Sequence, residues 1–328
     1  MRVLLASRIH PEAVEVLRER HDVVCAFDAT ERVLRQVVRD REVLVFRSGV
    51  TIDAALMERA PDLQLLIRAG SGLDNLDLGY VERRGIELVR VPGPGARAVA
   101  EMAFALMLML SRNLIEADRS MRLARWAKHE LNGYLLQGKT LGIVGLGNIG
   151  RTVAGLGVAW GMEVVGCDEH TVRAQAGRLL QEGVRLLGLD QVVRRADHLC
   201  IHVPLKDSTH HLIDEGVLAR MKRGAYLINL SRGGVVDEKA LLEALTDGDR
   251  LRGAALDVHE REGEGRLSPL AALPNVILTP HIGAMTVDTQ RQIGRRIVEI
   301  VASRHRGDPG LRPGPVGVVS LDGTEMAG

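Results

Sequence analysis

Three side chains in the second half of the chain, Arg232, Glu262 and His281, are of types that can move a proton and stabilise negative charge. Histidine gives and takes a proton near neutral pH. A carboxylate beside it would stabilise the imidazolium and hold the ring, and an arginine would supply fixed positive charge with two parallel donors. This set could protonate and stabilise the alkoxide that develops when a carbonyl group is reduced.

Each of the three residues also has an ordinary structural interpretation. Arg232 could be a surface residue at a helix start, and His281 could be a satisfied loop histidine. Glu262 is one charge among several in its segment, so Glu260 or Glu264 could take its role. The joint interpretation is favoured because the segments that carry them follow strand-like runs, and the carboxyl ends of parallel strands face the ligand crevice.

A GxGxxG motif lies between an aliphatic run and a helical pattern. We expect Gly145 to make the tight turn, Gly147 to let the backbone approach a pyrophosphate, and Gly150 to let the helix pack on the strand. Asp168 ends the next strand-like run, near the spacing of about 20 residues expected for the acid that holds the adenosine ribose. Its charge favours NAD over NADP; a structural glycine turn with a solvated aspartate is the alternative.

Four other side chains near this motif and beyond it have weaker claims to a role. Arg173 and Arg178 could reach a 2′-phosphate, but their helical context favours a solvated face. His210 and His211 resemble surface turn residues, since no other histidine, cysteine or carboxylate sits at metal-ligand spacing around them. We therefore expect no metal site.

The elements that must position these residues form two series in which strands alternate with helices. Such alternation predicts parallel βαβ units and hence two doubly wound α/β domains. The Pro/Gly-rich segment 91–95 between the two series is a plausible domain crossing. The expected strands cover residues 3–6, 43–46, 65–67, 86–89, 141–144, 163–165, 198–203, 225–229, 254–256 and 276–278.

Helical patterns cover residues 11–20, 53–59, 98–121 and 286–302. The apolar stretch in the methionine-rich helix 98–121 is far shorter than the ~20 residues of a membrane span, so we expect a buried helix. The composition of the Gly/Pro-rich tail, residues 307–328, suggests disorder.

Composition excludes several classes of protein. The 328 residues are 46% hydrophobic and 26% charged, which allows two domains with sizeable cores. Balanced charge (Lys+Arg 43, Asp+Glu 42) and scarce aromatic residues disfavour a nucleic-acid partner. Three widely separated cysteines, Cys25, Cys167 and Cys200, fit reduced thiols. The N-terminus lacks the apolar region of a signal peptide, so we expect a cytoplasmic protein that does not bind membranes.

The glycine motif, together with segments 229–237, 253–262 and 278–284, resembles the D-isomer-specific 2-hydroxyacid dehydrogenase family, which includes phosphoglycerate dehydrogenases. The resemblance covers about residues 3–305. It implies a short form of the family without a C-terminal regulatory domain.

The same resemblance implies which residues form each domain and what each domain binds. A flavodoxin-like substrate domain would consist of residues 1–97 and 289–328, and a Rossmann NAD domain of residues 98–288. The substrate would lie in the cleft between them. Helix 98–121 would form a homodimer interface.

Roles follow residue by residue from the resemblance. Arg232 matches the arginine that binds the carboxylate and carbonyl of the substrate, His281 matches the acid/base, and Glu262 matches its partner. The family's proline after that acid is Gly263 here. Asp257 resembles the carboxylate that contacts the nicotinamide amide. The other expected cofactor-binding positions are Ser71, Gly145, Gly147, Asn148, Ile149, Gly150, Asp168, Val203, Pro204, Leu230, Ser231, Gly283 and Ala284.

A second match lies in the first half of the chain, where residues 68–77 resemble the loop whose backbone N–H groups bind the substrate carboxylate. Gly70, Ser71 and Gly72 would expose consecutive amides, which is the physical basis of an anion nest. Arg47 could meet a second anionic group on the substrate, and a role confined to its turn is the alternative.

The chain departs from the family at the hinge before the long helix. Arg90, Gly95 and Ala98 stand where the family commonly has polar residues. Because that segment borders the cleft in the family, the identity of the substrate stays open, including whether Arg90 contacts a second anionic group.

These observations lead to one expected function and its rivals. We expect an NAD-dependent oxidoreductase that interconverts a small anionic D-2-hydroxy acid and its 2-oxo acid, with phosphorylated and phosphonate acids among the candidate substrates. A nicotinamide-sensing co-repressor or a binding protein of the same fold is the alternative, although no segment indicates a peptide-binding surface. Formate dehydrogenase chemistry is disfavoured because that branch uses Gln at the position of Glu262.

Overall fold

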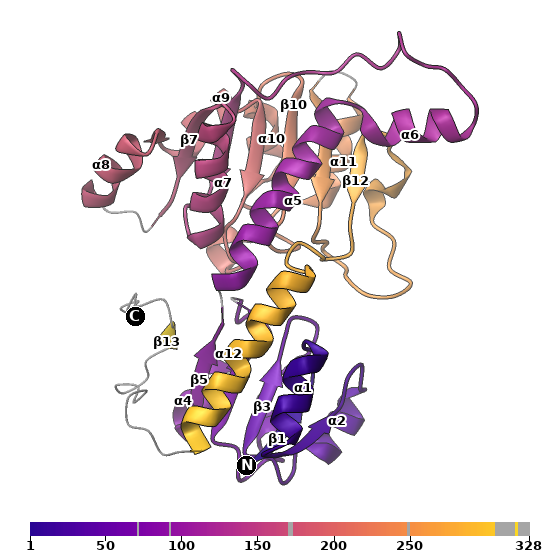
Figure 1. Ribbon diagram of the computed structural model, residues 1–328. Helices are drawn as coiled ribbons and strands as arrows, with labels where there is room; N and C mark the ends of the chain where they lie inside the picture. Colours follow the sequence, from indigo (N-terminus) through magenta and orange to yellow (C-terminus); the bar gives the residue numbers. More distant parts are fainter. Residues whose placement is uncertain (71, 92, 170–172, 248–249, 306–318, 321–328) are drawn as a thin grey trace. The chain divides into compact units, whose positions relative to one another are not determined.

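The computed structural model describes residues 1–70, 72–91, 93–169, 173–247, 250–305 and 319–320. The chain forms two compact units. Unit 1 consists of Met1–Gly95 and Met285–Gly328, and unit 2 of Ala96–Ala284. Each unit is built around one parallel sheet with helices packed on it (Figure 1). Two doubly wound α/β units were expected, and this fold class is confirmed.

Unit 1 contains a sheet with the strand order β13-β5-β4-β3-β1-β2. Its central strands β3 (Val43–Phe46) and β4 (Leu65–Arg68) are buried throughout, as strands covered on both faces by helices must be. Helix α12 (Val287–His305) returns to this unit and packs beside α1 (Pro11–Arg18) in one hydrophobic core (Figure 1). The other elements are β1 (Arg2–Leu5), β2 (Asp22–Cys25), α2 (Glu31–Val37), α3 (Ala54–Met57), α4 (Leu78–Arg84), β5 (Glu87–Arg90) and β13 (Val319–Ser320).

Unit 2 contains a sheet with the strand order β12-β11-β10-β9-β6-β7-β8, all in parallel. The chain runs outward from β6 through β7 and β8, and then continues on the other side of β6 with β9. Such a reversal of strand order is where open α/β sheets bind ligands. The elements are β6 (Thr140–Val144), α7 (Asn148–Ala159), β7 (Glu163–Cys167), α8 (Arg173–Gln181), β8 (Val184–Leu186), α9 (Leu189–Arg195), β9 (His198–Ile201), η1 (Asp207–Thr209), α10 (Glu215–Arg220), β10 (Ala225–Asn229), α11 (Glu238–Thr246), β11 (Leu251–Leu256), η2 (Pro269–Ala272) and β12 (Val276–Leu278).

The expected single helix over residues 98–121 is wrong, because the structure forms two helices there. Helix α5 covers Gly93–Ser111 and α6 covers Leu114–Arg122. Between them Asn113 adopts a left-handed conformation (φ 51°), which asparagine tolerates better than most residues and which ends α5. Periodicity alone missed this break because apolar residues continue on both sides of it.

Helix α5 is the one helix among the described residues that is long and apolar enough to cross a membrane by length and composition alone. Half of its most apolar window is buried inside the structure. Phe104 and Met107 pack in the same core as Leu141 of β6. The apolar face of α5 is therefore used for packing in unit 2.

Three elements differ from the sequence predictions at the edges of the sheets. The patterns missed β2 and β8, which are short edge strands with partly exposed side chains. In the tail, Val319–Ser320 pair with β5, so the prediction of disorder is wrong for these two residues. The rest of that prediction, residues 307–318 and 321–328, lies outside the described residues, as does the side chain of Arg173.

Candidate active site

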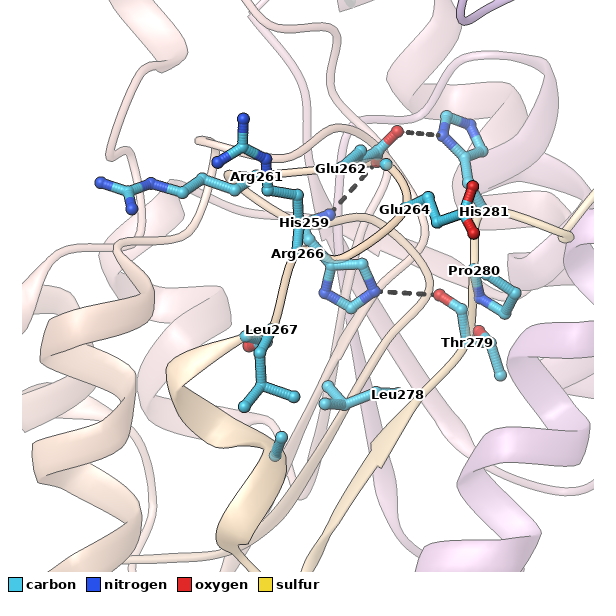
Figure 2. A pocket seen from close by; sticks show the side chains of 13 residues that line it. His259, Arg261, Glu262, Glu264, Arg266, Leu267, Leu278, Thr279, Pro280 and His281 are labelled. Atoms are coloured by element: carbon cyan, nitrogen blue, oxygen red, sulfur yellow. Dashed lines mark hydrogen bonds and ion pairs between the residues drawn. The ribbon is translucent and has the colours of Figure 1, made fainter. Parts of the chain in front are cut away.

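His281 and Glu262 form a hydrogen-bonded pair at the carboxyl edge of the unit 2 sheet. Nδ1 of His281 lies 3.0 Å from Oε2 of Glu262 (Figure 2). His281 follows β12 in a left-handed conformation (φ 54°), which is uncommon for a non-glycine residue and recurs at functional sites. The pairing leaves Nε2 of the imidazole as the atom that can meet a substrate.

The carboxyl group of Glu262 is kept in its charged form by its neighbours. Burial alone would raise its pKa, but the hydrogen bond and charge of His281, with the His259 backbone N–H, lower the pKa below its usual value. That N–H donates to Oε1 of Glu262 at 3.2 Å. A carboxylate in this place fixes which ring nitrogen of His281 carries the proton.

Asp257 holds the turn that carries His281. Its carboxylate is 2% exposed and accepts hydrogen bonds from the hydroxyl of Thr279 (2.6 Å) and the backbone N–H groups of Ile282 (2.9 Å) and Gly283 (2.8 Å). Its backbone oxygen accepts from the N–H of His281 at 2.8 Å. The resemblance implied a contact with nicotinamide for Asp257, and the structure shows this second, positioning role that spacing did not predict.

Arg232 lies on the loop after β10, and hydrogen bonds within that loop shape it. Asn229 Nδ2 donates to the backbone oxygen of Arg232 at 3.2 Å, and Arg232 Nη1 donates to the backbone oxygen of Ser231 at 2.7 Å. The next residue must be glycine, because a Cβ on Gly233 would lie 1.8 Å from the carbonyl oxygen of His259. The Arg232 loop therefore packs directly against the segment that bears Glu262.

Three neighbouring strands deliver these groups to one edge of the sheet. The loops that follow β10, β11 and β12 carry Arg232, Glu262 and His281 respectively, and these strands are adjacent in the sheet. Sequence reasoning left Glu260 and Glu264 as alternatives to Glu262. The structure brings Glu262 to His281, whereas Glu260 turns toward His211.

The glycine turn after β6 has the shape that its spacing predicts. Gly145 adopts φ 97°, and a Cβ on Gly150 would lie 1.9 Å from the carbonyl oxygen of Gly145. Gly147 precedes α7, and a Cβ added to it would have no atom within 4 Å, which leaves room at the N-terminus of that helix. Backbone N–H groups at a helix N-terminus favour an anion such as a pyrophosphate.

Asp168 lies beside this turn, where its Oδ2 accepts from the backbone N–H of Leu146 at 2.7 Å. The remaining expected cofactor positions of unit 2 also follow carboxyl ends of strands or open α7. Leu230 and Ser231 are buried, and Pro204 is exposed. These positions are Asn148, Ile149, Val203, Pro204, Leu230, Ser231, Gly283 and Ala284.

We predict that Asp168→Asn weakens the discrimination between NAD and NADP. The amide oxygen of Asn can still accept from Leu146, whereas the negative charge that repels a 2′-phosphate is lost. Hydrogen bonds to charged groups contribute roughly 1.5 kcal/mol or more, so we expect a change of about tenfold in the ratio of dissociation constants, measured by fluorescence titration. Glu169→Gln, an exposed neighbour, is the control. An unchanged ratio would show that Asp168 does not face the ribose.

Unit 1 carries its own group of cationic side chains at strand ends. Arg68 ends β4 and pairs in register with Arg90, which ends β5, while Arg47 directly follows β3. Burial lowers the pKa of the Arg47 and Arg90 guanidinium groups from their usual value. Arg47 Nη1 donates to the neutral side-chain amide of Gln290. Sequence reasoning missed Arg68 as a candidate, although its place at the end of a buried strand was the available signal.

The glycine loop of unit 1 differs from the expected anion nest. The N–H of Gly70 donates to the backbone oxygen of Arg68 at 2.8 Å, and Nε of Arg68 donates to the backbone oxygen of Gly72 at 2.7 Å. The Gly70 amide is therefore paired within the loop in this structure, and its role as a nest donor stays a prediction. Ser71 lies outside the described residues.

The fold brings two carboxylates to His211, although none sits at metal-ligand spacing around it in the sequence. Nε2 of His211 lies 3.2 Å from Glu260 Oε1, and Nδ1 lies 3.6 Å from Asp237 Oδ2. Sequence spacing hid this cluster because the fold brings its members together from separate loops. Both carboxylates also accept backbone N–H groups at the start of α11, Asp237 from Lys239 and Glu260 from Glu238.

A cavity of about 540 Å³ lies against the His281–Glu262 pair. Its wall combines the strand end Leu278–His281 with the loop after β11, from which Arg261 and Arg266 extend (Figure 2). Leu267 and Leu278 add an apolar side. The cationic side chains on its wall and the volume of this cavity suit a small molecule beside the His281–Glu262 pair.

Comparison with known proteins gives the family of the chain. Residues 104–283 match the family described as D-isomer specific 2-hydroxyacid dehydrogenase, NAD binding domain. The chain belongs to this family. The match shows that unit 2 contains the family's NAD-binding domain, and NAD is the family's cofactor.

Relatives that align over nearly the whole chain agree with this assignment. A D-3-phosphoglycerate dehydrogenase of Methanocaldococcus jannaschii is 37% identical over 94% of the chain, which spans only 58% of that relative's length. A hydroxypyruvate reductase of Thermotoga maritima is 36% identical over 91% of the chain and 96% of its own length. The structure of a D-lactate dehydrogenase of Aquifex aeolicus, complexed with NAD and lactic acid, shares 30% identity and a TM-score of 0.83, covering 93% of this chain and 96% of its own.

Proposed function

We propose that the chain is an NAD-dependent dehydrogenase that interconverts a small anionic D-2-hydroxy acid and its 2-oxo acid. The observation that carries the proposal is the His281–Glu262 pair, with Arg232 on the neighbouring strand end, in the same unit as the glycine turn. This unit belongs to a family of NAD-binding dehydrogenases. In this proposal unit 2 is the NAD domain and unit 1 is the substrate domain.

The residues at the glycine turn fit a dinucleotide. Gly147 leaves open space at the N-terminus of α7, and Asp168 lies beside the turn with its carboxylate on the Leu146 N–H. When bound, NAD supplies or accepts the hydride at C2 of the substrate. Gly147 would allow approach of the pyrophosphate, and Asp168 would hold the ribose hydroxyls.

The side chains at the sheet edge would handle charge and protons. In the direction of reduction, Nε2 of His281 would donate a proton to the developing alkoxide while Glu262 stabilises the imidazolium. Arg232 would bind the substrate carboxylate and place positive charge beside the carbonyl oxygen. In the direction of oxidation, the same Nε2 would accept the hydroxyl proton.

The arginines of unit 1 support a substrate with a second anionic group. Arg47, Arg68 and Arg90 end or follow three adjacent parallel strands. Burial disfavours the charged form of Arg47 and Arg90, and an anionic ligand group would offset that cost. We therefore place a phosphorylated or phosphonate 2-oxo acid ahead of pyruvate as a substrate.

The test is a panel of 2-oxo acids, with and without a phosphoryl or phosphonate group, followed by loss of NADH absorbance. We expect turnover on at least one acid and a higher kcat/KM for members with the second anionic group. Arg90→Ala should reduce the difference in kcat/KM between acids with and without the second anionic group. Binding of NADH with no turnover on any acid would instead favour a nicotinamide-sensing co-repressor or binding protein.

We also propose that the chain forms a homodimer through unit 2 and acts in the cytoplasm. Residues 114–135 expose several large apolar side chains, among them Leu123 (70% exposed) and Trp126 (74% exposed), as surfaces that bind another protein chain do. A monomeric mass in scattering at micromolar concentration would contradict the dimer.

The proposed cytoplasmic location is supported by three free cysteines, and recovery of the protein outside the cytoplasm on cell fractionation would contradict it.

A further inference from the structure

Glu238 is a buried carboxylate that the proposed reaction does not use. It opens α11 and is 3% exposed. Its Oε1 accepts from the backbone N–H of Glu260 at 2.7 Å, and its Oε2 accepts from the hydroxyl of Ser268 at 2.9 Å. A buried carboxylate is costly unless its oxygens are satisfied, so these hydrogen bonds account for its place in the fold. Both carboxylate oxygens therefore accept hydrogen bonds from one segment, the loop of residues 257–268.

The attachment between Glu238 and Glu260 is reciprocal. The backbone N–H of Glu238 donates to Oε1 of Glu260 at 3.1 Å, so each residue binds the carboxylate of the other through its main chain. Nε2 of His211 lies 3.2 Å from the same Oε1 atom of Glu260. These hydrogen bonds therefore fix the position of the 257–268 loop relative to the start of α11.

The loop that Glu238 holds has little packing of its own. Residues 260–267 are all exposed, and Gly263 and Gly265 have positive φ values of 119° and 73°. Burial therefore does little to fix the conformation of this stretch. Glu262 lies between the two attachment points, Glu260 and Ser268, and its carboxylate must meet Nδ1 of His281.

We propose that Glu238 is a positioning residue of the reaction, whose buried carboxylate holds the 257–268 loop so that Glu262 faces Nδ1 of His281. The imidazole then keeps its proton on Nδ1 when neutral and presents Nε2 to the substrate. This inference rests on the proposed function, in which His281 is the acid/base. It adds a residue that touches neither substrate nor cofactor.

The tautomer of His281 is the readout that tests the proposal. In protein labelled with ¹⁵N-histidine, long-range ¹H–¹⁵N correlation at alkaline pH shows which ring nitrogen carries the proton, and His281→Gln identifies the signal. We expect Nδ1–H in the unsubstituted chain. Glu238→Ala should shift His281 toward the Nε2–H form that a free imidazole prefers. It should lower kcat by roughly tenfold to a hundredfold, as misplacement by about 1 Å does, with KM and NADH affinity unchanged.

Matched variants separate positioning from general stability. Glu238→Gln keeps an acceptor for the Glu260 N–H and an amide group beside Ser268, so it should restore the Nδ1–H tautomer and most of kcat. Glu243→Ala removes an exposed acid from the same helix and should change neither. Glu238→Ala with a lower Tm but an unchanged tautomer and kcat would overturn the proposal.

Ser268→Ala covers the case in which Glu238→Ala does not fold. It frees one end of the loop and leaves the Glu238–Glu260 hydrogen bonds in place, so a mixture of tautomers is expected. An unchanged tautomer in Ser268→Ala would equally overturn the proposal. Because the spectrum requires no turnover, a chain inactive on every 2-oxo acid would refute the proposed function while the role of Glu238 is still decided by the tautomer.

Discussion

Replacing His281 by alanine is expected to lower kcat for reduction of the preferred 2-oxo acid by about 10²- to 10⁴-fold, the range that general acid–base catalysis contributes. In the structure, Nε2 of His281 is left for the substrate because Glu262 binds Nδ1. Removal of the ring leaves water as the proton donor. NADH affinity should be unchanged, since the glycine turn lies at the end of a different strand, β6.

Single-turnover measurements with NADH in excess would isolate this effect from product release. Arg195→Ala, which removes an exposed side chain of the same unit, is the control and should keep full activity. Near-normal turnover of His281→Ala in the direction of reduction would show that another group donates the proton. His259 would then be the first residue to test, because it lies on the loop that bears Glu262 and its Nε2 is 3.0 Å from the backbone oxygen of Thr279.

The sequence predicted the parts of the fold that local pattern determines. Short apolar runs such as 43–46 and 225–229 correspond to β3 and β10 residue for residue, because central parallel strands need uninterrupted apolar sequence. Edge strands β2 and β8 escaped detection because they carry no such run. The break at Asn113 escaped because helical periodicity does not register a single left-handed residue.

The sequence predicted the candidate site where a residue type suited to the chemistry follows the end of a strand, as at His281 and Arg232. The choice of Glu262 over Glu260 was not, because both follow β11 within an exposed loop and only tertiary hydrogen bonds separate them. A further tertiary hydrogen bond, from the backbone N–H of Glu260 to the carboxylate of Glu238 at the start of α11, was also invisible to spacing. The clustering of Glu260 with His211 was equally hidden from spacing.

Arg232→Ala is expected to lower kcat/KM for the 2-oxo acid by at least about 10²- to 10³-fold, the cost of removing one donor from a developing oxyanion. The guanidinium would also bind the substrate carboxylate, so KM for the acid should rise while the affinity for NADH stays the same. Tm, measured in parallel, separates loss of the guanidinium from loss of the fold.

Arg232→Lys distinguishes charge from geometry. Lysine retains the positive charge but cannot offer two parallel donors, so we expect it to recover part of kcat and little of the affinity for the substrate carboxylate. Arg195→Ala, which removes an exposed arginine of unit 2, should match the unsubstituted chain. Full activity in Arg232→Lys would show that only charge is needed. Full activity in Arg232→Ala would show that another cation binds the substrate carboxylate, and Arg261 and Arg266, which line the cavity beside the His281–Glu262 pair, would be tested next.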